Sequence, residues 1–227
     1  MSEKYAWRGG TEMLLRHGEG ATTTLLVLPA LFEEANRMRR FAVSLMRRLA
    51  EAGIGTVLPD LPGTGESLAD LADVTLDDWR DVVAGVAETL PKPLMTLAIR
   101  GGAILDGTAD FGWRLAPESG ERMLRDLVRA TALSSGRSAS EIDRAARARP
   151  TALAGQTLSP ALYQALLLAP AIGANRRTVR LGEDPGPRDA SLDGKRLWRG
   201  AEPGDDPDLA DLAAADIVLW TKTCAAP

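Results

Sequence analysis

The stretch that decides the fold is Leu94-Met-Thr-Leu-Ala-Ile-Arg-Gly-Gly-Ala-Ile-Leu105. A short apolar run meets Arg100, Gly101 and Gly102 and then continues apolar, which indicates a strand, a sharp turn and a helix. Small residues on both sides of position 100 permit a tight turn with a strained backbone. The pattern therefore places the side chain of residue 100 at the carboxyl end of a buried strand, where ligands collect in open α/β sheets.

Strand and helix patterns alternate along the rest of the chain. Strand-like runs are expected at residues 13–16, 24–28, 54–58, 94–99, 111–116, 177–181 and 195–198, the first two forming an antiparallel hairpin. Helical periodicity is expected at about 36–50, 76–90 and 207–220, and residues 182–194 form a loop. From residue 118 to 170 the pattern is helical and more polar. This alternation predicts one α/β domain over residues 1–227, with a mostly parallel sheet and helices on both faces.

Composition narrows the classes of protein that remain. The chain has 227 residues, 45% hydrophobic and 26% charged, as in an ordinary globular domain. A net charge of −4 gives no basic footprint, so nucleic acid is not expected as a partner. No apolar run has the length of a bilayer span and the first residues lack the apolar core of a signal peptide, so a cytoplasmic location is expected. Cys224 is the sole cysteine, and neither a metal site nor a cofactor is expected.

Several motifs together resemble the α/β-hydrolases. Pro59-Asp-Leu-Pro-Gly-Thr-Gly-Glu-Ser67 is similar to a D-x-x-G-x-G-x-S loop of that superfamily, and the turn at residue 100 is similar to its nucleophile elbow, G-x-S-x-G. Pro29-Ala-Leu-Phe-Glu-Glu-Ala-Asn-Arg-Met-Arg-Arg40 resembles a segment of the hydrolase-like proteins encoded beside exosortase genes in bacterial exopolysaccharide clusters. The resemblance implies an α/β-hydrolase fold in which residues 118–170 form a short helical lid.

The resemblance also implies where catalytic groups should stand, in the order nucleophile, acid and histidine. The nucleophile position holds Arg100, a permanent cation with no attacking oxygen or sulfur. Glu183 or Asp184 stands at the acid position, and no histidine follows Trp198. The sole histidine, His17, lies in the predicted opening hairpin. Two of the three groups that an activated serine requires are therefore absent.

Arg100 has two interpretations. With the free N–H groups at the start of the following helix, including that of Gly101, it could bind an anion. Alternatively it pairs with Glu33, Glu34 or Asp60, whose loops should converge on the same edge of the sheet. Asn36 reads as the N-cap of the first helix or as a polar ligand contact, and Arg39 could turn inwards. The candidate ligand-binding residues are Arg100, Glu33, Glu34, Asn36, Arg39, Asp60 and Gly101.

Three functional hypotheses follow. The leading one is a catalytically silent α/β-hydrolase homologue that binds a small anionic ligand or a protein partner in exopolysaccharide production and export. The alternative is a hydrolase or transferase in which Glu33, Glu34 or Asp184 activates water while Arg100 clamps a phosphate or carboxylate. The third is an assembly subunit that self-associates as a homo-oligomer, through the lid or the arginine-rich first helix.

Overall fold

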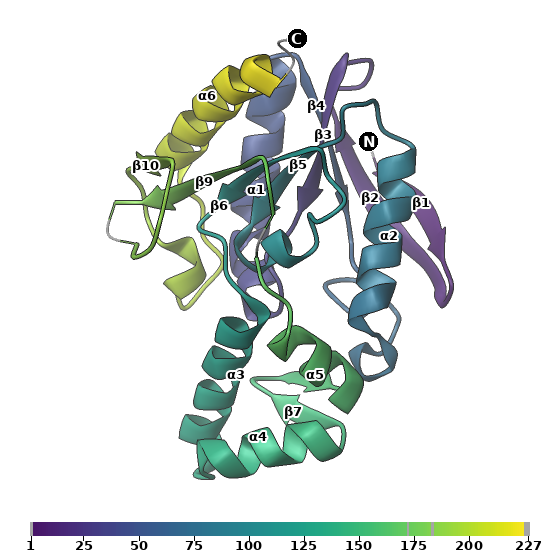
Figure 1. Ribbon diagram of the computed structural model, residues 1–227, viewed down its shortest axis with the longest axis vertical. Helices are drawn as coiled ribbons and strands as arrows, with labels where there is room; N and C mark the ends of the chain where they lie inside the picture. Colours follow the sequence, from purple (N-terminus) through teal and green to yellow (C-terminus); the bar gives the residue numbers. More distant parts are fainter. Residues whose placement is uncertain (1, 172, 183, 225–227) are drawn as a thin grey trace.

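One eight-stranded sheet organises the protein. The computed structural model describes residues 2–171, 173–182 and 184–224. The strands lie in the order β1-β2-β4-β3-β5-β6-β9-β10 (Figure 1). Their bounds are β1 Ser2–Trp7, β2 Gly10–His17, β3 Thr23–Leu28, β4 Ile54–Pro59, β5 Met95–Ile99, β6 Phe111–Leu115, β9 Arg176–Leu181 and β10 Ala190–Leu192. Neighbours from β4 to β10 are parallel, whereas β2 is antiparallel to both of its neighbours, β1 and β4. The predicted mostly parallel α/β sheet is confirmed.

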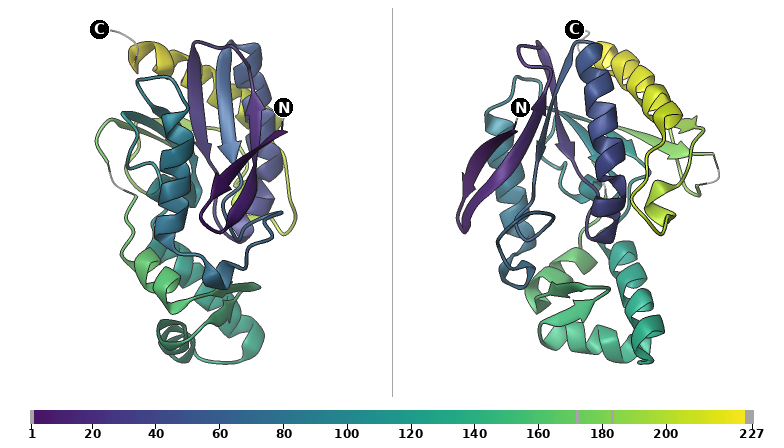
Figure 2. Two further views of the ribbon diagram at one scale, coloured as in Figure 1. Left: turned by 90° about the vertical axis from the view of Figure 1, so that its right-hand side faces the viewer. Right: turned by 180° about the vertical axis from the view of Figure 1, so that it is seen from behind.

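Helices cover both faces of this sheet, as predicted (Figures 1 and 2). Side chains of β3 alternate between the two faces because successive residues of a strand point in opposite directions. Leu25 and Val27 join the core with α1 and α6, whereas Leu26 and Leu28 join the core with α2. These helices are α1 Glu33–Glu51, α2 Leu76–Glu88 and α6 Pro207–Cys224; short 3₁₀ helices are η1 Leu71–Asp73, η2 Arg100–Ile104 and η3 Leu197–Arg199. Among the described helices, none combines the length and the apolarity that a bilayer crossing requires.

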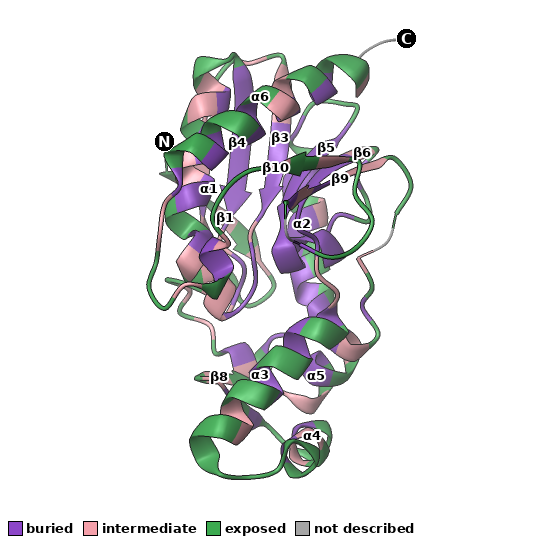
Figure 3. Cartoon of the chain, turned by 90° about the vertical axis from the view of Figure 1, so that its left-hand side faces the viewer, coloured by how far each residue is buried: buried purple, intermediate pink, exposed green. Residues whose placement is uncertain are grey.

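A separate group of elements, the insertion (residues 118–170), lies between β6 and β9 in the chain and beyond one end of the sheet (Figures 1 and 2). Its elements are α3 Gly120–Ser135, α4 Ala139–Ala148, β7 Thr151–Leu153, β8 Gln156–Leu158 and α5 Pro160–Leu167. Ser119, Ser138 and Ser159 cap the three helices with side-chain oxygens, which explains where each helix begins. Figure 3 shows buried residues in the central strands and mostly exposed residues on the outer faces of α3 and α4.

The predicted hairpin between residues 13–16 and 24–28 is wrong. β2 pairs with β1 and β4, and β4 separates it from β3. β1 alternates exposed and half-buried residues and contains Glu3 and Lys4, so it carries little apolar signal in the sequence. β3 is buried almost throughout, which suits a central strand rather than one arm of an edge hairpin.

Other boundaries also differ from expectation. Residues 195–198 do not form a strand, because Leu197 and Trp198 are both buried in a 3₁₀ turn, and the last strand, β10, falls in the expected loop. Asn36 is not an N-cap: α1 begins at Glu33, after Phe32, whose backbone has a positive φ of 58° and a ψ of −136°. The insertion contains a hairpin, β7 with β8, in a segment that was expected to be helical.

Asp78 connects the first hairpin to α2. Its carboxylate accepts hydrogen bonds from the backbone N–H and hydroxyl of Thr75, at 2.8 and 2.6 Å, and from Arg8 Nη2 at 2.7 Å. The hydrogen bonds from Arg8 hold the pKa of Asp78 well below its usual range, assisted by those from Thr75 and opposed by burial.

We expect Asp78→Asn to lower the free energy of unfolding by about 1–2 kcal/mol at pH 7. Because the pKa of Asp78 is lower in the folded state than in the unfolded state, its ionised carboxylate stabilises the folded protein at pH values above the unfolded pKa, which lies near 4. This stabilisation is lost as the pH falls toward the folded pKa. The gap between wild type and variant should therefore narrow from pH 5 to pH 3 in urea titrations. Asp77→Asn, an exposed change in the same helical turn, is the control; a gap that stays constant to pH 3 contradicts the linkage.

Candidate functional site

The turn after β5 has the strained geometry that the sequence predicts. Arg100 has φ of 52°, a left-handed conformation that costs a non-glycine residue about 1–2 kcal/mol. A Cβ on Gly102 would clash with the carbonyl oxygens of Leu28 and Pro29, so this position requires glycine. Gly101 is buried beside Met123 of the insertion and Leu31. The turn thus presents residue 100 between the carboxyl edge of the sheet and the insertion.

The Arg100 side chain is only 6% exposed and makes a dense set of contacts. Nε and Nη2 each donate to one carboxylate oxygen of Glu34, both at 3.0 Å. Nη1 donates to the carbonyl oxygen of Ala116 at 2.7 Å, and Glu118 Oε2 lies 3.5 Å from Nη2. The guanidinium carbon lies 4.6 Å from the centre of the Trp198 ring, in a cation–π arrangement.

This geometry supports the second interpretation of Arg100, an ion pair that joins loops. The bidentate contact uses the edge of the guanidinium that would otherwise hold a phosphate or carboxylate. The remaining Nη1 edge faces the Ala116 carbonyl. An anion at this position would have to displace Glu34, so the role of Arg100 as an anion ligand gains no support.

Each candidate acid of the described chain is paired with a different arginine. The shortest distances are 2.9 Å for Glu33 with Arg37, 3.0 Å for Glu34 with Arg100, 2.6 Å for Asp60 with Arg39 and 2.8 Å for Asp184 with Arg196. Asp184 follows β9 at the position expected for a catalytic acid, and it meets an arginine there instead of a histidine. Glu183 lies outside the described residues. A carboxylate engaged in this way is poorly placed to take a proton from water.

His17 lies at the opposite edge of the sheet from Arg100. In the register of the sheet it stands opposite Thr56, in the first half of β4, whereas Arg100 follows the carboxyl end of β5. Burial lowers the pKa of His17, and the charge of Arg47 acts in the same direction. The protein's single histidine therefore cannot serve as a base at residue 100.

Two residues at the site were not singled out in the sequence. The sequence predicts only that Glu118 lies at the start of the lid and Trp198 in a last strand. Their only signal is position, because Glu118 follows β6 by three residues and Trp198 stands just before the segment where a histidine was expected. Both lie against Arg100.

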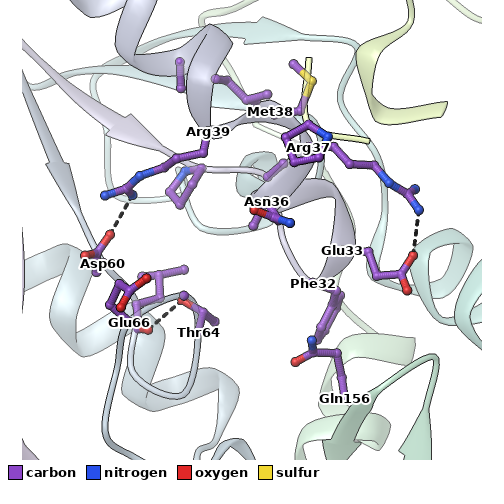
Figure 4. Close-up of a pocket in the computed structure, with 18 of the residues that line it drawn as sticks. Phe32, Glu33, Asn36, Arg37, Met38, Arg39, Asp60, Thr64, Glu66 and Gln156 are labelled. Atoms are coloured by element: carbon purple, nitrogen blue, oxygen red, sulfur yellow. Dashed lines mark hydrogen bonds and ion pairs between the residues drawn. The ribbon is translucent and has the colours of Figure 1, made fainter. Parts of the chain in front are cut away.

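Two cavities lie between the sheet and the insertion. The first, about 580 Å³, is bounded by the start of α1, the loop after β4 and β8 (Figure 4). The second, about 530 Å³, lies between Arg100 and α3. Asn36, Arg39 and Asp60 line the first cavity, Arg100 and Glu34 the second, and Glu33 both. Across the residues that the structure describes, His, Cys, Asp and Glu side chains form no cluster of three that could hold a metal ion.

Comparison with solved structures identifies the fold. The chain is similar to alpha/beta hydrolase domain-containing protein 10 from mouse, with a TM-score of 0.66 and 14% identity over 99% of this chain and 100% of that one. Est1E from Butyrivibrio proteoclasticus, solved with ferulic acid bound, has a TM-score of 0.60 and 11% identity over 97% and 98% of the two chains. The thioesterase domain from the curacin biosynthetic pathway has a TM-score of 0.56 and 13% identity over 97% and 99%. The α/β-hydrolase fold is therefore confirmed.

Sequence comparison adds nothing to this assignment. No protein-family model and no curated protein matches the chain. The sequence identities to the three solved structures lie between 11% and 14%, so the similarity establishes the fold and not the function. Function must therefore be argued from the side chains at the site.

We expect Arg100→Met to lower the free energy of unfolding by about 2–4 kcal/mol. The change removes the cation that lies between the carboxylates of Glu34 and Glu118 and leaves these two negative charges without their partner. The double variant Arg100→Met with Glu34→Gln should lose less than the sum of the single changes, as measured by urea unfolding. Arg125→Met is the matched control, since its ion pair with Glu121 is exposed and should contribute less than about 1 kcal/mol. Strictly additive losses would refute the coupling.

Proposed function

We propose that the protein is a catalytically silent α/β-hydrolase homologue that acts by binding rather than by turnover. The observation that carries this proposal is the bidentate ion pair of Arg100 with Glu34 at the nucleophile position. An arginine cannot attack an acyl carbon, and Trp198 covers its face near the segment where a histidine would be expected. The constellation needed for serine chemistry is thus replaced by an ion pair that joins β5 to the start of α1.

Ser67 contacts a carboxylate, as an activated nucleophile would need a base, but its other contacts argue against that role. Its Oγ donates to Oε1 of the buried Glu12 at 2.6 Å. The same oxygen accepts hydrogen bonds from the backbone N–H groups of Gly63 and Ala69, at 2.9 and 3.1 Å. A hydroxyl oxygen has two lone pairs, and both are engaged. Ser67 therefore holds the loop after β4 and lacks a free lone pair for attack.

The alternative, carboxylate-based hydrolysis with Arg100 as an anion clamp, finds no support in the geometry. It requires an acid that faces Arg100 across a gap wide enough for a substrate. Glu34 instead contacts Arg100 directly, and Glu33 and Asp184 are paired with Arg37 and Arg196. Because Arg100 has no free edge for an anion, our proposal keeps a binding role for the protein but does not include an anionic ligand at Arg100.

The setting that we propose is exopolysaccharide production and export, with the protein in the cytoplasm and a small molecule or a protein as partner. The support is the resemblance of residues 29–40 to the exosortase-associated proteins. In the structure this segment supplies Glu34 to the ion pair with Arg100, and Asn36 and Arg39 to the wall of the first cavity. The segment that carries the resemblance thus also builds the site.

The test is reaction of the protein with a fluorophosphonate probe, together with a panel of ester and thioester substrates. We expect neither labelling nor turnover by wild type. Arg100→Ser should also be inactive, because a restored hydroxyl still lacks a histidine base and an orienting acid. Turnover that persists in Arg100→Ala but disappears in Ser67→Ala, or on changing another serine, would show that the protein is an enzyme.

A further inference from the structure

The first cavity has the size and composition of a binding site for a small polar molecule. Its volume of about 580 Å³ falls within the range usual for small-molecule sites, about 300–1,000 Å³. Figure 4 shows side chains from three parts of the chain around it: α1, the loop after β4, and β8. It lies at the ends of strands, since Ile99 of β5 and Leu58 of β4 contribute to its wall. This is the usual location of ligands in α/β folds.

Charges on the wall of this cavity largely cancel. Arg39 Nη1 lies 2.6 Å from Asp60 Oδ1, and Arg37 Nη2 lies 2.9 Å from Glu33 Oε2 (Figure 4). In the described part of the chain, Glu66 at the rim makes no ion pair, so the wall retains at most one negative charge. A phosphate or carboxylate ligand would meet no free cation here and would compete with the existing carboxylates. The cavity therefore favours a ligand without negative charge.

Two amide side chains on the wall have hydrogen-bonding capacity to spare. The side-chain amides of Asn36, an exposed residue of α1, and Gln156, a half-buried residue of β8, make no hydrogen bond with any residue that the structure describes. Each amide offers two donors and an acceptor, the combination that matches a hydroxyl group, which both donates and accepts. Because they belong to the sheet domain and to the insertion respectively, both amides could contact one molecule bound between them (Figure 4).

The remaining wall suits the carbon skeleton of such a ligand. Phe32 lines the cavity between the two amides, and its ring is fixed by packing against Trp79, with the ring centres 6.1 Å apart. Met38 and Ala42 of α1 lie behind this wall and are almost fully buried in the core. A ring with polar edges and an apolar face fits amides at its rim and an aromatic side chain against its face.

We infer that the first cavity is a binding site for a neutral polyhydroxylated ring, the chemistry of an uncharged sugar, held by the amides of Asn36 and Gln156 and by the paired side chains on the wall. The inference rests on the proposed function, because it gives the silent fold a ligand class. A ligand of this kind differs from the substrate of an esterase or thioesterase, because its recognition requires no reactive carbonyl group.

The experiment is saturation-transfer NMR with four sugars that share one ring and differ in charge: glucose, N-acetylglucosamine, glucosamine and glucuronic acid. We expect saturation transfer to glucose and N-acetylglucosamine, and at least fivefold weaker binding of glucuronic acid. Asn36→Ala and Gln156→Ala should each weaken binding of the neutral sugars at least fivefold. Both variants should keep the urea midpoint of wild type, because neither amide makes a hydrogen bond within the described protein.

Gln164→Ala is the matched control, because this glutamine lies on α5 of the same insertion and its amide donates to the Arg147 carbonyl, outside the cavity. It should leave sugar binding unchanged. Absence of binding by the neutral sugars, stronger binding of either charged sugar, or binding that both amide variants retain would overturn the inference. Each of these results leaves the proposed function standing when the fluorophosphonate and ester assays show no turnover, so the two failures are distinguishable.

Discussion

The bidentate ion pair between Arg100 and Glu34 is the interaction on which the carboxyl edge of the sheet depends. Transferring two charges out of water costs several kcal/mol for each ion, and attraction offsets that cost only where further hydrogen bonds complete the geometry. Here the Ala116 carbonyl and the Trp198 ring provide the additional contacts. The end of β5, the start of α1, the exit of β6 and η3 are consequently fixed to one another through a single guanidinium.

A second buried ion pair supports the turn from the other side. Asp106, just after η2, accepts from Nε and Nη2 of Arg114 at 2.7 and 2.6 Å, and both residues are almost fully buried. Arg176 of β9 lies 3.3 Å from the same carboxylate and donates to the Asp106 carbonyl. The η2 segment is therefore anchored to β6 and β9 behind the turn, while Arg100 anchors it to α1 in front. This double anchoring explains how a non-glycine residue can be held at φ of 52°.

Much of the fold could be predicted because its signals are local. The apolar run of β5 followed by Gly101 and Gly102 predicted the turn, and the structure places it there. The order of the strands could not be predicted in the same way, because pairing depends on which distant apolar runs meet. β1 shows the limit most clearly: it belongs to the sheet through backbone hydrogen bonds to β2, while its side chains alternate between exposed and half-buried.

The sequence predicted residues that lie at the candidate site, but it did not predict which of them contact one another. Glu34 was one of three acids proposed as a partner for Arg100, and the choice among them depends on where α1 begins. The predicted cap at Asn36 would have left Glu33 and Glu34 in a loop. The helix in fact begins at Glu33 because Phe32 adopts a rare backbone conformation that its residue type does not signal. That start puts Glu34 in the first turn, facing Arg100, and leaves Asn36 exposed to the cavity.

The same ion pair occupies the position at which hydrolases of this fold carry their nucleophile. In a hydrolase of this fold the strained turn presents a hydroxyl to the substrate; here it directs a guanidinium across the carboxyl edge to Glu34. Arg100 and Trp198 line the second cavity but not the first, whereas Phe32 and Glu33 line both. The space that a substrate would enter is thus partitioned at α1. Asn36 lies on the side of the first cavity, away from residue 100, so the sugar site that we propose would use contacts other than those of the residue at the strained turn.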